Sequence, residues 1–263
     1  MNRVARALIW HELLERTRDR WVLVISGLFA MLAMGIGLYG GNGNSDMGLT
    51  GPSLVTLAGL FVPLVALVLG HDAVVGERER NTYGLLCSLP IGLMELVVAK
   101  FIGRLGALLG AVALGLGGAL LLSVSGGGYI LWMILPRTLL LGAAFLSMGI
   151  LISTLVKRQV TAASMVVSTW FLLVFFYDLG LLGLLVITDG ALSADATSYM
   201  VMANPAGLFR LDLLTSFGGQ EVLSNLGLTV SLPSSMGSIL IWSAWILVPL
   251  LLSGFILRRG KAS

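Results

Sequence analysis

Charged residues are scarce in this chain. They make up 11% of its 263 residues, whereas about 25% is usual in soluble domains. Hydrophobic residues make up 57%, and the mean hydropathy is +0.98. The composition excludes an ordinary soluble domain and indicates an integral membrane protein.

Cysteine and histidine are nearly absent as well. The single cysteine, Cys87, excludes a disulfide within the chain, and two histidines, His11 and His71, exclude a histidine-rich metal cage. The histidines form no His-x3-His or Glu-x2-His pair, so an enzyme acting alone, with catalytic residues of its own, is not expected. No Gly-x4-Gly-Lys-Ser/Thr phosphate loop occurs, so the chain cannot bind ATP by that device. We expect no bound cofactor and no nucleic-acid partner.

Long apolar segments dominate what is present. Six of them are long enough for a membrane-spanning helix, which needs roughly 17 to 25 residues. They cover residues 21–39, 53–69, 97–124, 133–156, 160–187 and 238–257. Because Pro136 and Arg137 interrupt the start of the fourth segment, we expect a short separate helix over 129–136 that turns into it. The pattern predicts an all-α fold with six transmembrane helices, forming one transmembrane domain over 1–263.

Basic residues sort to one side of this arrangement. Six spans place both termini, the loop 71–96 and the turn 157–159 on one side, with all but two of the 16 basic residues. The exceptions are Arg137 and Arg210. The positive-inside rule then makes both termini cytoplasmic and places the segment 188–237 outside.

Residues 1–20 combine apolar and charged positions at helical spacing. Val4, Leu8, Ile9 and Leu13 form the apolar set, and arginines and acids fill the rest. This pattern is typical of an interfacial helix lying among lipid headgroups. A simple basic arm that only orients the chain is the alternative.

Two further patterns concern packing. Small residues three or four apart, such as Gly103, Gly106, Gly142 and Gly149, predict close contact between the third and fourth spans. Outside the membrane, Asn204-Pro205 precedes an apolar patch over 206–217, which predicts a helix start. We expect that helix at the outer surface, with Leu208, Phe209, Leu211 and Leu214 facing the membrane or a partner.

The loop 71–96 is a polar island between two spans. Glu77, Arg78, Glu79 and Arg80 give it a mixed-sign face, and an apolar set follows: Tyr83, Leu85, Leu86, Leu89 and Ile91. Such an amphipathic unit can lie on a membrane or dock in a groove of a partner. From charge alone, a solvated loop is the better interpretation of residues 77–80.

The same loop resembles a known family. Gly76-Glu77-Arg78-Glu79, followed by Thr82, Leu85-Leu86, Pro90 and Lys100, is similar to the first cytoplasmic loop of type-2 ABC exporter permeases. Further runs resemble more closely the permeases of ABC transporters that mature nitrous-oxide reductase; they are 13–33, 72–77, Tyr177-Asp178-Leu179 and 204–211. Where the family often has Gly before the threonine, this chain has Asn81, which a left-handed turn would accept.

The resemblance implies a set of partners. It implies the type-2 exporter fold with an N-terminal interfacial elbow helix, a homodimer in the lipid of the bacterial inner membrane, and an ATPase on a separate chain that binds the ATP. It also implies a periplasmic accessory protein at the outer loop. The residues that would couple to the ATPase are Gly76, Glu77, Arg78, Glu79, Thr82, Leu85, Leu86, Pro90, Lys157 and Arg158.

The implied activity is export of a sulfur or copper species, or mechanical work on a periplasmic partner, for assembly of the copper centre of nitrous-oxide reductase. Two alternatives stay open. One is a general exporter of a drug, lipid or ion, and the other is a membrane scaffold that transports nothing.

Two residue types inside or beside the spans raise separate questions. Asp178 is an acid within a span, which indicates a pathway or pairing role. It also lies 18 residues after Val160, roughly 27 Å along a helix, and this position favours a solvated acid at the outer end. Two methionine pairs, Met31 with Met34 and Met200 with Met202, could offer Cu(I) thioether ligands or simply fill apolar packing.

Overall fold

The computed structural model describes residues 3–40, 47–122, 127–189, 193–213, 216 and 235–260. These residues are helical and contain no strand, which confirms the all-α prediction. The longer helices are α1 (Arg3–Thr17), α2 (Arg20–Gly40), α3 (Met47–Gly70), α6 (Leu93–Leu122), α7 (Gly127–Leu155), α8 (Gln159–Phe171), α9 (Tyr177–Ile187), α10 (Ala194–Met202) and α12 (Ser235–Gly260). The short ones are α4 (Val75–Glu79), α5 (Tyr83–Ser88) and the π-helical turn η1 (Leu172–Phe176).

Each predicted span is a helix. Five stretches are long and apolar enough to cross a membrane, namely 51–79, 93–119, 132–155, 159–187 and 236–259. The bent pair of α1 and α2, at 64°, makes six if it counts as one span. The fold is therefore that of a helical membrane protein, with η1 joining α8 and α9 into one span.

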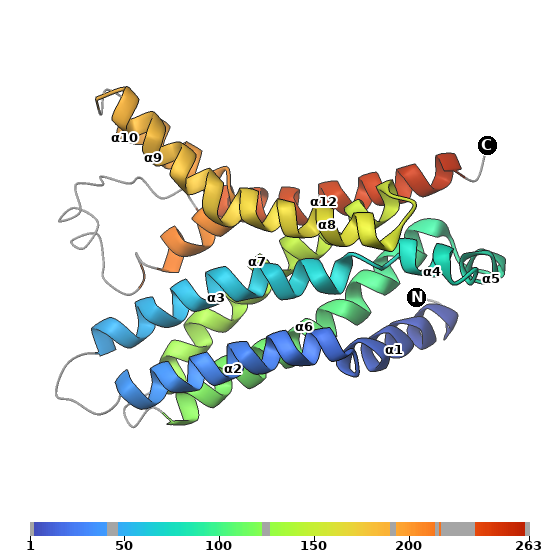
Figure 1. Cartoon of the computed structure of the whole chain (residues 1–263), viewed down its shortest axis with the longest axis horizontal. Helices are drawn as coiled ribbons and strands as arrows, with labels where there is room; N and C mark the ends of the chain where they lie inside the picture. The colour runs from blue at the N-terminus through green and yellow to red at the C-terminus, as the bar shows by residue number, and fades with distance from the viewer. Residues whose placement is uncertain are drawn as a thin grey trace.

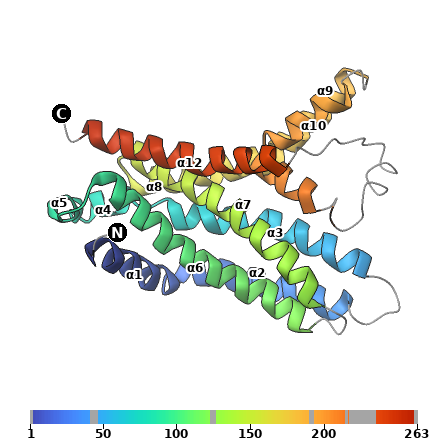
Figure 2. The same ribbon diagram turned by 180° about the vertical axis from the view of Figure 1, so that it is seen from behind.

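The helices lie alongside one another in a bundle (Figure 1). α7 packs against α3, α6 and α12, while α6 packs also against α1 and α2. Both termini, α4 and α5 gather at one end, and α9 and α10 lie at the other (Figures 1 and 2). We call the first end, formed by α1, α4, α5, the turn 156–158 and the last turn of α12, the basic end. The opposite end is the far end.

The predicted break at Pro136 is wrong. α7 runs without interruption from Gly127 to Leu155, with Pro136 inside it. Proline disturbs the hydrogen bonds of the preceding turn, and here Arg137 Nη1 donates to the Met133 carbonyl oxygen at 2.9 Å. The N–H that Pro136 lacks would have bonded to the Trp132 carbonyl oxygen, and the loss of one such bond does not end a long membrane-spanning helix.

The glycines of the third span, α6, contact α1 and α2 rather than the fourth span, α7, which was the predicted neighbour. A Cβ at Gly103 would lie 2.7 Å from Glu12 Cβ of α1, and one at Gly115 would lie 2.3 Å from the Phe29 ring of α2. α6 and α7 do pack together, because Gly142 of α7 lies against the Leu108 side chain of α6. Close approach through glycine therefore joins α6 mainly to α1 and α2.

A close helix crossing joins α3 to α7. A Cβ at Gly149 would lie 3.0 Å from Gly70 Cα, a backbone atom that cannot move aside cheaply. We expect Gly149→Ala to cost about 1 to 3 kcal/mol through overpacking. A thermal melt of the purified protein in detergent measures this. Gly110→Ala is the control, since nothing lies within 4 Å of its new Cβ; an equal loss in both variants would contradict the close crossing.

The predicted outer helix forms, but it faces the protein. Residues 205–213 are helical, and Leu208, Phe209 and Leu211 are buried. The Phe209 ring packs near Gly59 of α3, where an added Cβ would lie 3.6 Å from the ring. The absence of a side chain at Gly59 lets the ring lie close to the backbone of α3. The expectation that this face meets the membrane or a partner is wrong for these three residues; Leu214 lies outside the described residues.

Candidate functional site

Six charged side chains meet inside the basic end. They are Glu12 and Arg16 of α1, Asp72 in the turn after α3, Glu77 of α4, and Lys100 and Arg104 of α6. We call them the ion cluster. Three are acids and three are bases, so the formal charges cancel. Five of the six residues are buried, and Glu77 is partly exposed.

Arg104 joins the largest number of elements in the ion cluster. Its Nε donates to Glu12 Oε2 at 3.0 Å, and its Nη1 lies 2.6 Å from Asp72 Oδ1 and also donates to the Leu69 carbonyl oxygen. The residue is 0% exposed. One guanidinium group therefore ties α6 to α1 and to the end of α3.

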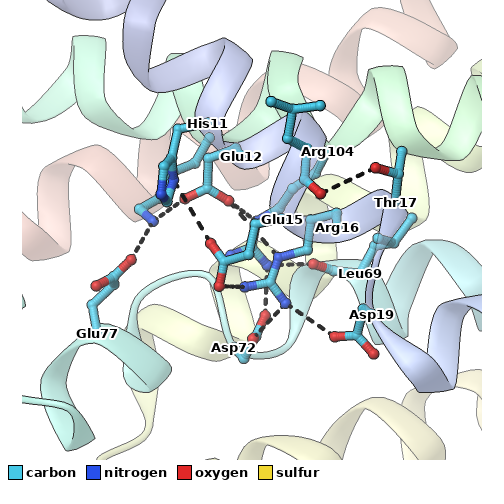
Figure 3. Close-up of polar contacts among 12 residues, drawn as sticks. His11, Glu12, Glu15, Arg16, Thr17, Asp19, Leu69, Asp72, Glu77 and Arg104 are labelled. Atoms are coloured by element: carbon cyan, nitrogen blue, oxygen red, sulfur yellow. Dashed lines mark hydrogen bonds and ion pairs between the residues drawn. The ribbon is translucent and has the colours of Figure 1, made fainter.

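The remaining bases complete the cluster (Figure 3). Arg16 Nη1 donates to the other Asp72 carboxylate oxygen, Oδ2, at 2.7 Å. Lys100 Nζ donates to Glu12 and, at 3.0 Å, to Glu77 Oε1. Each acid thus receives charge-assisted hydrogen bonds, which is the condition under which buried charge is tolerated.

α1 is not the simple amphipathic helix that its pattern predicted. Glu12 and Arg16 turn inward and are buried, whereas Trp10 is 62% exposed and Leu14 is exposed too. The predicted arrangement, with charges outward, fails because α6 and Asp72 offer opposite charges at the contact. An interfacial position still agrees with the exposed Trp10 and Leu14, which suit a lipid boundary.

The run 77–80 connects four elements in succession. Glu77 binds Lys100 of α6 as well as the Thr82 hydroxyl, and Arg78 Nη1 donates to the Thr154 carbonyl oxygen of α7 at 3.3 Å. Glu79 Oε1 accepts from the backbone N–H of Gln159 at the start of α8 at 2.8 Å, and Arg80 lies 3.2 Å from Glu15 of α1. The run is therefore tied to the bundle by its side chains, while Glu79 and Arg80 remain exposed.

α5 is an exposed part of the loop. It buries no residue, and Leu85 is 70% exposed. Asn81, at φ 57°, adopts the left-handed turn expected of it and leads from α4 into α5. Burial raises the pKa of Tyr83, so its ring stays neutral beside Arg78, whose guanidinium carbon lies 5.4 Å from the ring centre. The exposed apolar side chain of the predicted amphipathic unit, Leu85, thus lies on α5.

Other predicted coupling residues surround α5 and α4. Lys157 and Arg158 are exposed in the turn between α7 and α8, directly before the Gln159 amide that Glu79 caps. Gly76 is buried against Asp72, and Thr82, Leu86 and Pro90 are partly or fully exposed. The structure brings the two predicted coupling regions, 76–90 and 157–158, to one surface.

A second polar contact lies toward the far end. Asp178 Oδ2 is 2.5 Å from Arg210 Nη2, Tyr177 donates to the Met200 carbonyl oxygen at 2.6 Å, and Asn204 donates to the Leu173 carbonyl oxygen of η1. The runs 177–179 and 204–211, which are far apart in the sequence, therefore meet in the structure. Asp178 and Arg210 are each about one-third exposed, so Asp178 is a paired acid rather than a solvated one.

The two methionine pairs, one on α2 and one on α10, do not lie near each other. Met31 is 60% exposed, while Met34 packs against Gly118 of α6. Met202 is buried in the apolar core, and α10, which carries it, lies well apart from α2 in both views (Figures 1 and 2). Among the described residues, no group of three or more His, Cys, Asp or Glu side chains is placed to hold a metal.

The ion cluster was not predicted from the sequence, although the spacing of its residues indicates part of it. Glu12 with Arg16, and Lys100 with Arg104, are both spaced i, i+4, so each pair shares one helix face. A pair of bases on one face of an apolar span needs acids opposite it. The sequence does not say which acids those are.

The membrane-spanning bundle, with the exposed α5 next to a run of residues that contacts four helices, is compatible with the membrane subunit of a transporter. The chain belongs to the ABC-2 transporter family, because the model of the ABC-2 family transporter protein matches residues 6–261.

Two curated relatives agree with this assignment. Both are named "Probable ABC transporter permease protein NosY". The one from Stutzerimonas stutzeri is 36% identical and the one from Pseudomonas aeruginosa 33%, each over 94% of this chain and 95% of the relative. The chain is therefore a permease subunit of an ABC transporter.

Proposed function

We propose that this permease couples ATP hydrolysis on a separate ATPase subunit to movement of its spans, and that α5 is the surface on which the ATPase docks. The observation that carries the proposal is the contrast within one loop. α5 buries no residue, whereas the adjoining run 77–80 contacts α6, α7, α8 and α1. A partner that moves α5 would therefore act on α6, α7, α8 and α1 through the adjoining residues 77–80.

The docking surface would combine apolar and basic groups. Leu85 offers an exposed apolar side chain, and Lys157 and Arg158 lie beside the same region. Exposed large apolar residues surrounded by charge are typical of protein contacts. The residues Glu77 and Arg78, predicted as part of the docking face, would instead transmit movement from it.

The ion cluster would keep the moving parts together. Because each buried charge loses its partner if one element shifts alone, α1, the end of α3, α4 and α6 are held as one body. Movement of α5 would then be passed on as a rigid displacement of this body. We infer that the basic end lies in the cytoplasm, with both termini there, in the bacterial inner membrane.

We further infer a homodimer. α8, η1 and α9 expose apolar side chains along their length, among them Val160, Leu172 and Leu179. Membrane lipid or a second copy of the chain would cover them. ATP hydrolysis by two ATPase subunits then requires one permease surface for each.

For the biological role, we infer maturation of the copper centre of nitrous-oxide reductase. The support is the resemblance of the runs 72–77, 177–179 and 204–211 to permeases of that kind. Two of these runs form one contact in the structure. A sulfur or copper species could be the cargo, or the permease could perform mechanical work on a periplasmic accessory protein that binds the outer segment.

We favour mechanical work over passage of a polar cargo. α7 lies at the centre of the bundle, and its Leu141, Phe145 and Ile150 are fully buried in apolar packing. Its buried hydroxyls are engaged too, since Ser147 donates to a carbonyl of α7 or α12, and Ser153 accepts from the backbone N–H groups of Val74 and Val75.

The test combines two readouts in a host that makes nitrous-oxide reductase. The tagged chain should co-purify with its ATPase. The reductase should lose its copper centre when the chain is deleted or when the ATPase carries an inactivating substitution. A fully loaded reductase in the deletion strain would favour a general exporter. Loading that needs the chain but tolerates an inactive ATPase would favour a scaffold.

A further inference from the structure

An apolar groove lies at the basic end, between the first turn of α6 and the last turns of α12. Its volume is about 370 Å³, and it is lined by Met94, Leu251, Leu252, Gly254, Phe255 and Arg258. That size falls within the range of about 300 to 1,000 Å³ usual for ligand sites. A Cβ at Gly254 would lie 2.5 Å from Met94 Sδ, so glycine lets the two helices approach here.

The rim of this groove is positively charged. Arg258 is exposed and forms no ion pair within the part of the chain that the structure describes. The guanidinium of Arg259 lies 4.3 Å over the Phe255 ring. Glu95, the acid next to Met94, points its carboxylate at the Gly92 backbone N–H at 3.4 Å instead. An apolar hollow thus ends in an arginine that has no ion-pair partner among the described residues.

We propose that this groove binds an anionic phospholipid of the leaflet at the basic end. One acyl chain lies along Leu251, Leu252 and Phe255, and the phosphate contacts Arg258. Leu251 is 58% and Phe255 51% exposed on a membrane-spanning helix, so they require an apolar cover. An arginine at the end of a span lies at headgroup depth and can bind phosphate through two N–H groups.

The proposed lipid would contact α6, the helix that carries Lys100 and Arg104 of the ion cluster. The groove touches Met94, in the first turn of the helix that carries Lys100 and Arg104. α6 begins five residues after α5 ends. A lipid bound here contacts the helix that links α5 to the ion cluster. The lipid site itself stands independently of the ATPase proposal.

Binding to the purified full-length chain in detergent tests the site, measured by native mass spectrometry. The probes are phosphatidylglycerol, phosphatidylcholine with the same acyl chains, and inorganic phosphate. We expect phosphatidylglycerol to bind about fivefold more tightly than phosphatidylcholine, the effect of one basic residue near a charged headgroup. Arg258→Gln should remove that preference, and Leu251→Trp, which fills the groove, should weaken binding of both lipids.

Two matched variants separate this site from general effects. Arg6→Gln removes an exposed arginine of α1 at the same end, and Leu247→Trp enlarges an exposed leucine one turn earlier on α12. Both should bind phosphatidylglycerol as the wild type does. Equal loss in Arg6→Gln, an unchanged preference in Arg258→Gln, or displacement of the lipid by inorganic phosphate would overturn the proposal.

Discussion

Replacement of Arg104 by leucine should lower the free energy of unfolding by about 3 to 5 kcal/mol, the usual cost of removing one partner from a buried ion pair. Arg104 is 0% exposed and binds both Glu12 and Asp72. Leucine would leave two carboxylates buried with fewer donors. The melting temperature in detergent should fall by roughly 10 °C, given about 2 to 4 °C per kcal/mol at this chain length.

An exposed arginine in the same region is the control. Arg80 pairs with Glu15, but its side chain is 59% exposed. Arg80→Leu should therefore change stability by no more than about 1 kcal/mol. The double variant Glu12→Gln with Arg104→Leu should lose less than the two single losses added together, because neutral glutamine needs no charged partner. Equal losses in Arg104→Leu and Arg80→Leu, with additive double-variant behaviour, would show that the ion cluster does not hold the basic end together.

Replacement of Leu85 by aspartate should separate the permease from its ATPase. An apolar anchor that becomes fully desolvated at an interface contributes about 2 kcal/mol or more, which is roughly thirtyfold in the dissociation constant. α5 buries no residue in the permease itself, so the change should leave the melting temperature unaltered. Co-purification of the ATPase with the tagged permease measures the effect.

Ile187→Asp is the matched control for this second experiment. Ile187 is 82% exposed and ends α9 at the far end. It receives the same change of side chain where no ATPase bound at the basic end could reach it. Retained ATPase in Leu85→Asp, or equal loss in both variants, would remove α5 as the docking surface.

The spans could be predicted because length and hydropathy are local properties. Each predicted segment coincides with a helix over nearly all of its described residues, and the ends of most differ by only a few residues. The start of the fourth span is the exception, because α7 continues through Pro136 from Gly127 to Leu155. Whether a proline ends a helix depends on how the surrounding fold accommodates the missing hydrogen bond, and a linear pattern does not reveal this.

The site was predicted only in part, because some of its features are local in the sequence and others depend on contacts between distant residues. The loop 71–96 was found because it is polar between apolar spans, and the left-handed turn at Asn81 followed from residue type. The directions of its side chains were not predictable. Glu77 faces Lys100, which is 23 residues away, and Glu12 faces Arg104, which is 92 residues away. The packing of α1 and α4 beside α6 brings such residues together.

The central claim is that Arg78 passes movement of α5 into the bundle, since it lies against Tyr83 of α5 and donates to carbonyl oxygens at the end of α7. The most direct measurement is the rate of ATP hydrolysis by the complex in proteoliposomes, compared between the wild type and Arg78→Met at equal amounts of bound ATPase. We expect the variant to retain the ATPase and to lose most of the permease-dependent stimulation. Full stimulation in Arg78→Met would contradict the claim, because the link between α5 and α7 would then be dispensable.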